Sequence, residues 1–393
     1  MTFKRNKIFI FIVALAFLFF GAPRVSAAES GDAGVDFNPL TVHYVDVGQG
    51  DATVIELPDS KTMLIDGGPD KNKAKFFTYM DESLSGIGGF DYVILTHSDE
   101  DHCGGLDDII AKFPVKENGV IYRPNQLATY KGFDDPALEK QGIETFWDGG
   151  GAAKAGKSTL AYKRFIEAAY NQKAENVKVI VTNANKLSEM NILNDLNGNG
   201  VYDGDEGEYL ISFYAPTQAV WKDVNDYSPI FSLDYQGKRF MFTGDSEKDG
   251  EKRFADEVAG GKIDLSIKVD VIKLGHHGSR TSTTTEYLNA VLPSLWYNPD
   301  VLAVISCGAG NSYKHPHKEV LDRLINTYGF AGENILRTDI SGTIVLSVFE
   351  GNLTYGAVVI GSSGGGKSCV TVTIGGIAAE FFIILFFVKI KRK

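Results

Sequence analysis

The chain has 393 residues, of which 44% are hydrophobic and 23% charged, and its formal net charge at pH 7 is −11. This hydrophobic content is that of a globular protein with a substantial core, which excludes disorder over most of the length. Proteins that bind a long nucleic-acid backbone usually carry a basic surface, whereas this chain has a negative net charge. Binding of long nucleic acids is therefore disfavoured.

The first 28 residues have the three parts of a secretory signal peptide. Lys4, Arg5 and Lys7 precede an apolar run from Ile8 to Phe20, and small residues suited to cleavage follow at Val25–Ala28. These 13 apolar residues are short for a bilayer span. The sequence therefore predicts passage through the export machinery and a mature protein in the cell envelope or outside the cell, possible surface anchoring included.

Short β-rich runs alternate with Gly and Pro turns through the body of the chain, which predicts an α/β protein with two related halves. Helical periodicity appears over 159–170 and 318–328. Strands are expected over 40–47, 52–57, 62–65, 92–95, 209–214, 230–235, 239–243, 269–274, 301–306 and 343–348. Polar clusters follow several of these strands, where layered α/β folds place their sites.

The densest of these clusters follows the apolar run Tyr92–Leu95. Two imidazoles and three carboxylates fall within six residues, at His97, Asp99, Glu100, Asp101 and His102. Such a group cannot be buried as an apolar core, and it stays solvated unless a cation organises it. Later histidines also come in pairs, at 276/277 and 315/317. The pattern predicts a polynuclear metal site.

A second group of oxygen side chains lies in an Asn/Gly-rich segment over residues 195–206. Oxygen ligands occupy positions 1, 3, 5, 9 and 12 of a 12-residue loop, and Gly200 stands at position 6, where the EF-hand loop turns sharply. The sequence predicts a Ca²⁺ ion that stiffens this segment. The expected ligands are Asp195, Asn197, Asn199, the carbonyl of Val201, Asp203 and Glu206.

Residues 361–393 resemble a bacterial C-terminal sorting tail. A Gly/Ser linker from Gly361 ends at Cys369, and a mostly apolar stretch from Val370 to Val388 precedes a basic cluster. The interpretation is a membrane-inserted tail that a sorting protease removes, and the alternative is a permanent membrane anchor. Glu380 favours the transient form, since an ionised carboxylate in hydrocarbon is costly.

Six ordered motifs together resemble a metallo-β-lactamase-fold hydrolase, and most of all the nuclease-like domain of ComEC-type competence proteins. They are Val45–Asp51, Ile65–Gly68, Thr96–Gly105, Thr243–Asp245, His276–Ser279 and Asn311–Pro316. The resemblance covers residues 38–352, with an insertion at about 114–208. It implies a four-layer αββα sandwich with a metal site at one edge of the two sheets.

The ligand types suit two Zn²⁺ or Mn²⁺ ions. We expect His97 and Asp99 at the first ion, Asp101 and His102 at the second, and Asp245 between them. Either His276 or His277 completes the first ion, strand alternation slightly favouring His276, and His315 completes the second. A shared water would lose a proton near neutral pH and act as the nucleophile. Catalysis is expected to depend on Asp101, Asp245, His276 and His277.

Two departures from the lactamase pattern bear on the substrate. Position 99 is Asp where β-lactamases and glyoxalases have His, and no histidine lies between His102 and Asp245. The chain thus resembles the competence-type branch and phosphorylcholine esterases, which implies a phosphate ester. Ser279 is expected to bind the phosphate, with help from Arg280 and Lys273, and either Tyr313 or His317 to donate a proton to the leaving group. The hypothesis is an exported phosphodiesterase acting on DNA or a phosphorylated wall polymer; the alternative is a non-catalytic, metal- and calcium-stabilised surface binding module.

Overall fold

The computed structural model describes residues 37–126, 159–182, 187–216, 221–265, 268–292, 300–363 and 367–376. The predicted signal peptide at residues 1–28 and the end of the chain from residue 377 lie outside the described residues. Across those ranges, no helix is both long and apolar enough to cross a bilayer.

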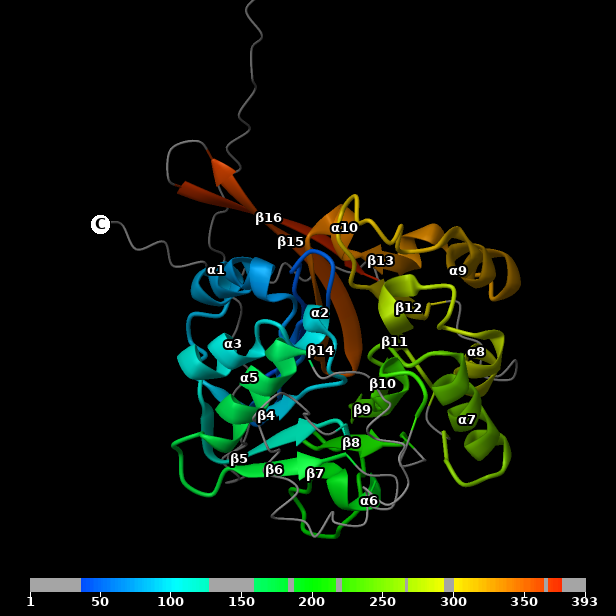
Figure 1. The fold of residues 1–393 in the computed structure, drawn as a ribbon. Helices are drawn as coiled ribbons and strands as arrows, with labels where there is room; N and C mark the ends of the chain where they lie inside the picture. Colours follow the sequence, from blue (N-terminus) through cyan, green and yellow to red (C-terminus); the bar gives the residue numbers. More distant parts are fainter. Residues whose placement is uncertain are drawn as a thin grey trace, which may run out of the picture. The chain divides into compact units, whose positions relative to one another are not determined.

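Two β-sheets form the centre of the described chain (Figure 1). The first has nine strands in the order β16-β15-β14-β1-β2-β3-β4-β5-β6, and only the pairs from β3 to β6 are parallel. Its strands are β1 (Leu40–Tyr44), β2 (Thr53–Glu56), β3 (Thr62–Ile65), β4 (Phe90–Ile94), β5 (Val115–Arg123), β6 (Lys178–Val181), β14 (Thr343–Phe349), β15 (Asn352–Ser363) and β16 (Lys367–Gly376).

The second sheet has seven strands in the order β13-β12-β11-β10-β9-β8-β7, antiparallel from β7 to β10 and parallel from β10 to β13. Its strands are β7 (Ile192–Asn194), β8 (Tyr209–Phe213), β9 (Phe231–Tyr235), β10 (Lys238–Phe242), β11 (Val271–Lys273), β12 (Leu302–Ile305) and β13 (Ile335–Arg337). In each sheet, the parallel strands end toward the functional side chains described below.

The two sheets pack face to face through one large apolar cluster. Aromatic rings cross the interface: Tyr44 stacks on Phe242 with centroids 6.4 Å apart, and Tyr122 contacts Phe213 at 5.3 Å. Burial of rings of this size supplies much of the stabilisation of such an interface.

Helices cover the outer faces (Figure 1). On the first sheet, the outer cluster includes α1 (Lys73–Ser83), α3 (Leu106–Lys112) and α5 (Leu160–Tyr170). On the second, it includes α7 (Lys248–Ala259), α8 (Thr285–Val291) and α9 (Lys318–Asp322). The predicted αββα sandwich is therefore confirmed.

The helices begin where the sequence places caps. The side chain of Thr159 accepts a hydrogen bond from the backbone N–H of Tyr162 at the start of α5, and Thr284 caps α8 in the same way. The helix expected over 318–328 begins at Lys318, but after Asp322 it continues as a π-helical turn, Arg323–Thr327.

Two expectations differ from the structure. The region expected as an insertion at about 114–208 contributes β5 and β6 to the first sheet and β7 to the second. The sheet also continues past residue 352, because β15 runs to Ser363 and β16 covers Lys367–Gly376, where the Gly/Ser linker and the start of the apolar tail stretch were expected. The β-branched run Val370–Ile374 explains this difference, since such side chains favour extended backbone.

Candidate metal centre

The site is built where strands of both sheets end. Asp66 follows β3 directly, and His97 lies just beyond β4. The short helix α2 (Glu100–Cys103) carries Asp101 and His102 on adjacent positions. From the second sheet, Asp245 follows β10, and the pair His276 and His277 follows β11.

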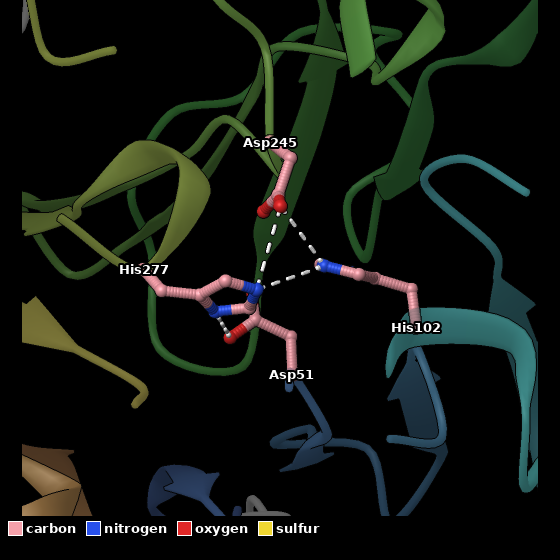
Figure 2. A group of neighbouring side chains, drawn as sticks. All are labelled: Asp51, His102, Asp245 and His277. Carbon is pink, nitrogen blue, oxygen red and sulfur yellow. Dashed lines mark hydrogen bonds and ion pairs between the residues drawn. The ribbon is translucent and has the colours of Figure 1, made fainter. Parts of the chain in front are cut away.

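Four buried side chains form the centre (Figure 2): Asp51, His102, Asp245 and His277, whose ligand atoms all lie within 4.8 Å of one another. Nε2 of His102 lies 3.2 Å from Oδ2 of Asp245, and Nε2 of His277 lies 3.4 Å from the same oxygen. The two Nε2 atoms are 3.3 Å apart.

A polar partner at Nδ1 orients each imidazole ring of the site. Nδ1 of His102 donates to the buried carboxylate of Asp66 at 2.7 Å, and Nδ1 of His277 donates to the carbonyl of Ser306 at 2.9 Å. Nδ1 of His276 lies 3.0 Å from the carboxylate of Glu247. A hydrogen bond at Nδ1 leaves the lone pair on Nε2, which is the arrangement of metal-ligating histidines.

His97 follows the same rule. The hydroxyl of Thr96 donates to Asp66 at 2.7 Å, so its oxygen accepts from Nδ1 of His97 at 3.1 Å. Nε2 of His97 is buried without a hydrogen-bond partner, as are Oδ1 of Asp245 and Oδ1 of Asp51. Leaving such atoms unpaired is costly. A divalent cation would satisfy both the Nε2 lone pairs that face one another and the carboxylate oxygens that lack a hydrogen-bond partner. The combination of imidazole and carboxylate ligands suits zinc or manganese.

Mutual charge effects confirm how strongly these groups interact. Burial opposes charge on His277, but Asp245 and Asp51 outweigh it and raise its pKa to about 10. Burial would raise the pKa of Asp101, but the neighbouring His277 and the charge of His102 lower it to about 2. Burial raises the pKa of Asp99 to about 6, with a further contribution from Asp101. The carboxylates that raise the pKa of His277 would also attract a metal cation.

The remaining expected ligands lie around this centre at longer distances. Nε2 of His97 is 3.7 Å from Asp99, and Nε2 of His276 is 3.7 Å from Asp245. Nε2 of His277 is 3.3 Å from Asp101. The structure thus places His277 beside Asp101 and His102, and not beside the pair at 97 and 99. Strand alternation favoured His276 as the inward residue, but both histidines have left-handed backbone, with φ of 48° and 54°, so alternation does not apply there.

Two expected substrate residues have other surroundings. The hydroxyl of Ser279 is buried and bonds to the hydroxyl of Thr281 at 2.9 Å. Tyr313 is 64% exposed, stacks on His315 with centroids 5.7 Å apart, and lines a groove of about 330 Å³ with Gln49, Asp99 and Asp101. Among the described residues, no carboxylate lies within ion-pair distance of His315. Each of the other site histidines has a carboxylate within that distance.

Sequence reasoning gave no role to Asp51, Asp66 or Glu247. Asp51 lies 3.4 Å from Nδ1 of His277 and pairs with the buried Lys273 at 2.8 Å. Both Asp51 and Asp66 belong to motifs noted above, and each stands in a Gly-rich turn next to a strand. Glu247 carries no comparable local signal.

In the calcium segment, Asp203, Asp205 and Glu208 bring oxygen atoms within 4.8 Å of one another. Glu208 is buried and accepts from the backbone N–H groups of Leu196 and Asp203, whereas Glu206 is exposed. The structure therefore groups Glu208, and not the expected Glu206, with the other acidic residues, because the chain turns at Gly207 with φ of 86°.

Comparison with known proteins agrees with this architecture. Residues 45–139 match the model of the metallo-beta-lactamase superfamily. A metallo-β-lactamase fold is supported by this match, by the two packed sheets between helix layers and by the histidine and aspartate site at the strand ends.

Curated relatives match parts of the chain. The chain is 27% identical over 318 residues to ComE operon protein 3 of Bacillus subtilis, covering 77% of this chain and 32% of that protein. It is 32% identical over 152 residues to Competence protein ComA of Neisseria gonorrhoeae, and this match covers 39% of this chain and 19% of that protein. The chain is similar in sequence to these proteins and spans about a third or less of their length. Among solved structures, the metallo-β-lactamase fold protein YhfI from Bacillus subtilis is 12% identical, with a TM-score of 0.35, and the match covers 76% of this chain and 95% of that one.

Proposed function

We propose that the mature protein is an exported, binuclear metal-dependent phosphodiesterase. The observation that carries this proposal is the position of Asp245, whose Oδ2 lies 3.2–3.7 Å from Nε2 of three histidines while its Oδ1 is buried without a partner. A carboxylate shared in this way is suited to bridge two ions.

The residues divide into two groups around that carboxylate. His97, Asp99 and His276 would hold one ion with Asp245, and Asp101, His102 and His277 the other, with Asp51 behind His277. Two ions bound there would lower the pKa of a shared water toward neutrality and so supply a nucleophile at physiological pH. Asp66, Glu247 and the carbonyl of Ser306 hold the imidazole rings so that this geometry is preformed.

The ligand set and the relatives both support a phosphate diester as substrate. Asp99 stands where lactam-cleaving enzymes have histidine. One of the relatives is named as a competence protein, which favours DNA as one substrate class. The groove beside the centre is lined by Asp99, Glu100 and Asp101 against Lys71, so long polyanions gain little there. We therefore infer a short contact with the scissile diester, in DNA or in a phosphorylated wall polymer.

The test measures the metal content of the purified mature protein and its hydrolysis of bis(p-nitrophenyl) phosphate. We expect about two zinc or manganese equivalents, with activity lost in Asp245→Ala and kept in Asp256→Ala, which changes an exposed aspartate on α7. Stoichiometric metal without turnover of diester, monoester or lactam would favour the non-catalytic binding module. Absence of a transition metal would refute the proposal.

We also propose a structural Ca²⁺ ion in the segment 195–208, held by Asp195, Asn197, Asn199, the carbonyl of Val201, Asp203 and Glu208. The amides of Asn197 and Asn199 donate to Asp203 at 2.9 and 2.6 Å, which gathers these side chains around one carboxylate. Calcium should raise the melting temperature of the wild type and of Glu206→Gln, but not of Glu208→Gln. Equal responses of the two variants would contradict the assignment of Glu208.

Export rests on the expected signal peptide at residues 1–28. Retention at the membrane rests on the expected C-terminal tail at residues 361–393. The export machinery and a C-terminal sorting protease are the partners this implies. Cell fractionation with mass determination of the mature chain tests both ends, and a cytoplasmic, unprocessed chain would contradict export.

A further inference from the structure

His315 lies at the rim of the metal centre but differs from the other histidines there. Its ring centroid is 5.5 Å from that of His276 and 6.0 Å from that of His277. Each of the four other site histidines has at least one carboxylate oxygen within 3.7 Å of a ring nitrogen. No such partner of His315 exists among the described parts of the chain.

The hydrogen bonds of Gln49 determine which nitrogen of His315 carries the proton. The side-chain oxygen of Gln49 accepts from the backbone N–H of Gly308 at 3.2 Å, which fixes the orientation of the amide. Its NH₂ group therefore faces Nδ1 of His315, at 3.4 Å. An amide N–H can only donate, so Nδ1 must accept, and the proton of the neutral ring resides on Nε2. This is the reverse of the other four histidines, where Nδ1 donates and Nε2 offers the lone pair.

The ring is held in place from several sides. Asn311 donates to the carbonyl of His315 at 2.6 Å and accepts from its backbone N–H at 2.9 Å. Tyr313 stacks on one face of the ring, with an interplanar angle of 22°. Gln49 and Tyr313 also line the groove that contains Asp99 and Asp101, so His315 lies next to the space where a substrate would reach the centre.

We propose that His315 is not a metal ligand and that its neutral imidazole donates the Nε2 hydrogen to a phosphoryl oxygen of the substrate. This inference rests on the proposed phosphodiesterase function and names a residue that contacts its substrate. A second proton on Nδ1 would collide with the amide of Gln49, so the ring acts as a fixed hydrogen-bond donor and transfers no proton. Such a donor stabilises negative charge that develops on the oxygen during attack. Gln49 is the positioning residue, because it selects the tautomer.

Three variants test the proposal. His315→Ala should keep the metal content of the wild type and lose about 10²- to 10³-fold in kcat on bis(p-nitrophenyl) phosphate, the cost of removing one such donor. Gln49→Glu keeps the bond from Gly308 but accepts from Nδ1, so it moves the proton off Nε2, and a loss of similar size is expected. Gln49→Met is the matched control, since it removes the amide without imposing the other tautomer, and its loss should be smaller.

Two readouts besides activity complete the test. ¹⁵N NMR of the ring should show the Nε2–H tautomer in the wild type and the Nδ1–H tautomer in Gln49→Glu. Inorganic phosphate should bind the metal-loaded wild type more tightly than metal-loaded His315→Ala. Loss of a metal equivalent in His315→Ala, unchanged kcat and phosphate affinity, or an Nδ1–H tautomer in the wild type would each overturn the proposal. If the wild type binds metal but hydrolyses no diester, the proposed function fails, and the tautomer and phosphate affinity still decide the role of His315.

Discussion

The buried ion pair between Lys273 and Asp51 should contribute strongly to stability, and Lys273→Met tests this. Nζ of Lys273 lies 2.8 Å from Oδ2 of Asp51, and the side chains are 4% and 6% exposed. The two residues are 222 positions apart: Lys273 ends β11 of the second sheet, and Asp51 lies in the loop before β2 of the first. Removing the ammonium takes away the nearer of two partners of this buried carboxylate, because Nδ1 of His277 lies 3.4 Å from its Oδ1.

The expected magnitude follows from that burial. Deleting one member of a buried pair costs about 3–5 kcal/mol, because the other charge is left uncompensated. The exposed pair Lys252–Asp256, whose side chains are about 60% exposed, supplies the matched control, and Lys252→Met should cost less than about 1 kcal/mol. The double variant Asp51→Asn, Lys273→Met should recover part of the loss, with a coupling of about 1–3 kcal/mol.

The assay is urea unfolding of the mature protein, with and without bound metal. A cation near Asp51 compensates part of its charge, so Lys273→Met should be less destabilised in the metal-loaded protein than in the metal-free one. A loss within about 1 kcal/mol of the exposed control in metal-free protein, or a double variant as unstable as the sum of the single ones, would refute the reasoning.

Two further predictions concern a buried carboxylic acid and a close backbone contact. Burial raises the pKa of Glu251 on α7 from 4.5 to about 7, so its contribution to stability is present below pH 4.5 and is lost as the pH rises through 7. The loss amounts to about 3 kcal/mol, and urea unfolding across this range should show it in the wild type but not in Glu251→Gln; parallel pH profiles would contradict it. A Cβ at Gly50 would lie 2.4 Å from the carbonyl oxygen of Asp101, whereas one at Gly86 would meet nothing within 4 Å. Gly50→Ala should therefore lose about 1–3 kcal/mol and bind metal more weakly, with Gly86→Ala near wild type; equal effects in calorimetry and metal titration would argue against the contact.

Local sequence determined much of this protein. The strands before His97 and Asp245 and the helix capped by Thr159 form where short-range patterns predict them. His97, Asp99, Asp101 and His102 come together because a strand end and one turn of helix suffice to do so. The fold class was implied by the resemblance of six ordered motifs to a known family.

The tertiary structure decided which groups face each other across the two sheets. Nothing near Asp51 in the sequence indicates that it meets Lys273 and His277, and nothing near His315 indicates that Gln49, 266 positions away, sets its tautomer. The left-handed backbone at His276 and His277 removed the alternation on which a choice between them relied. Propensity and periodicity describe neighbours along the chain, whereas the proton positions and partners of these side chains depend on contacts that exist only after both sheets have packed.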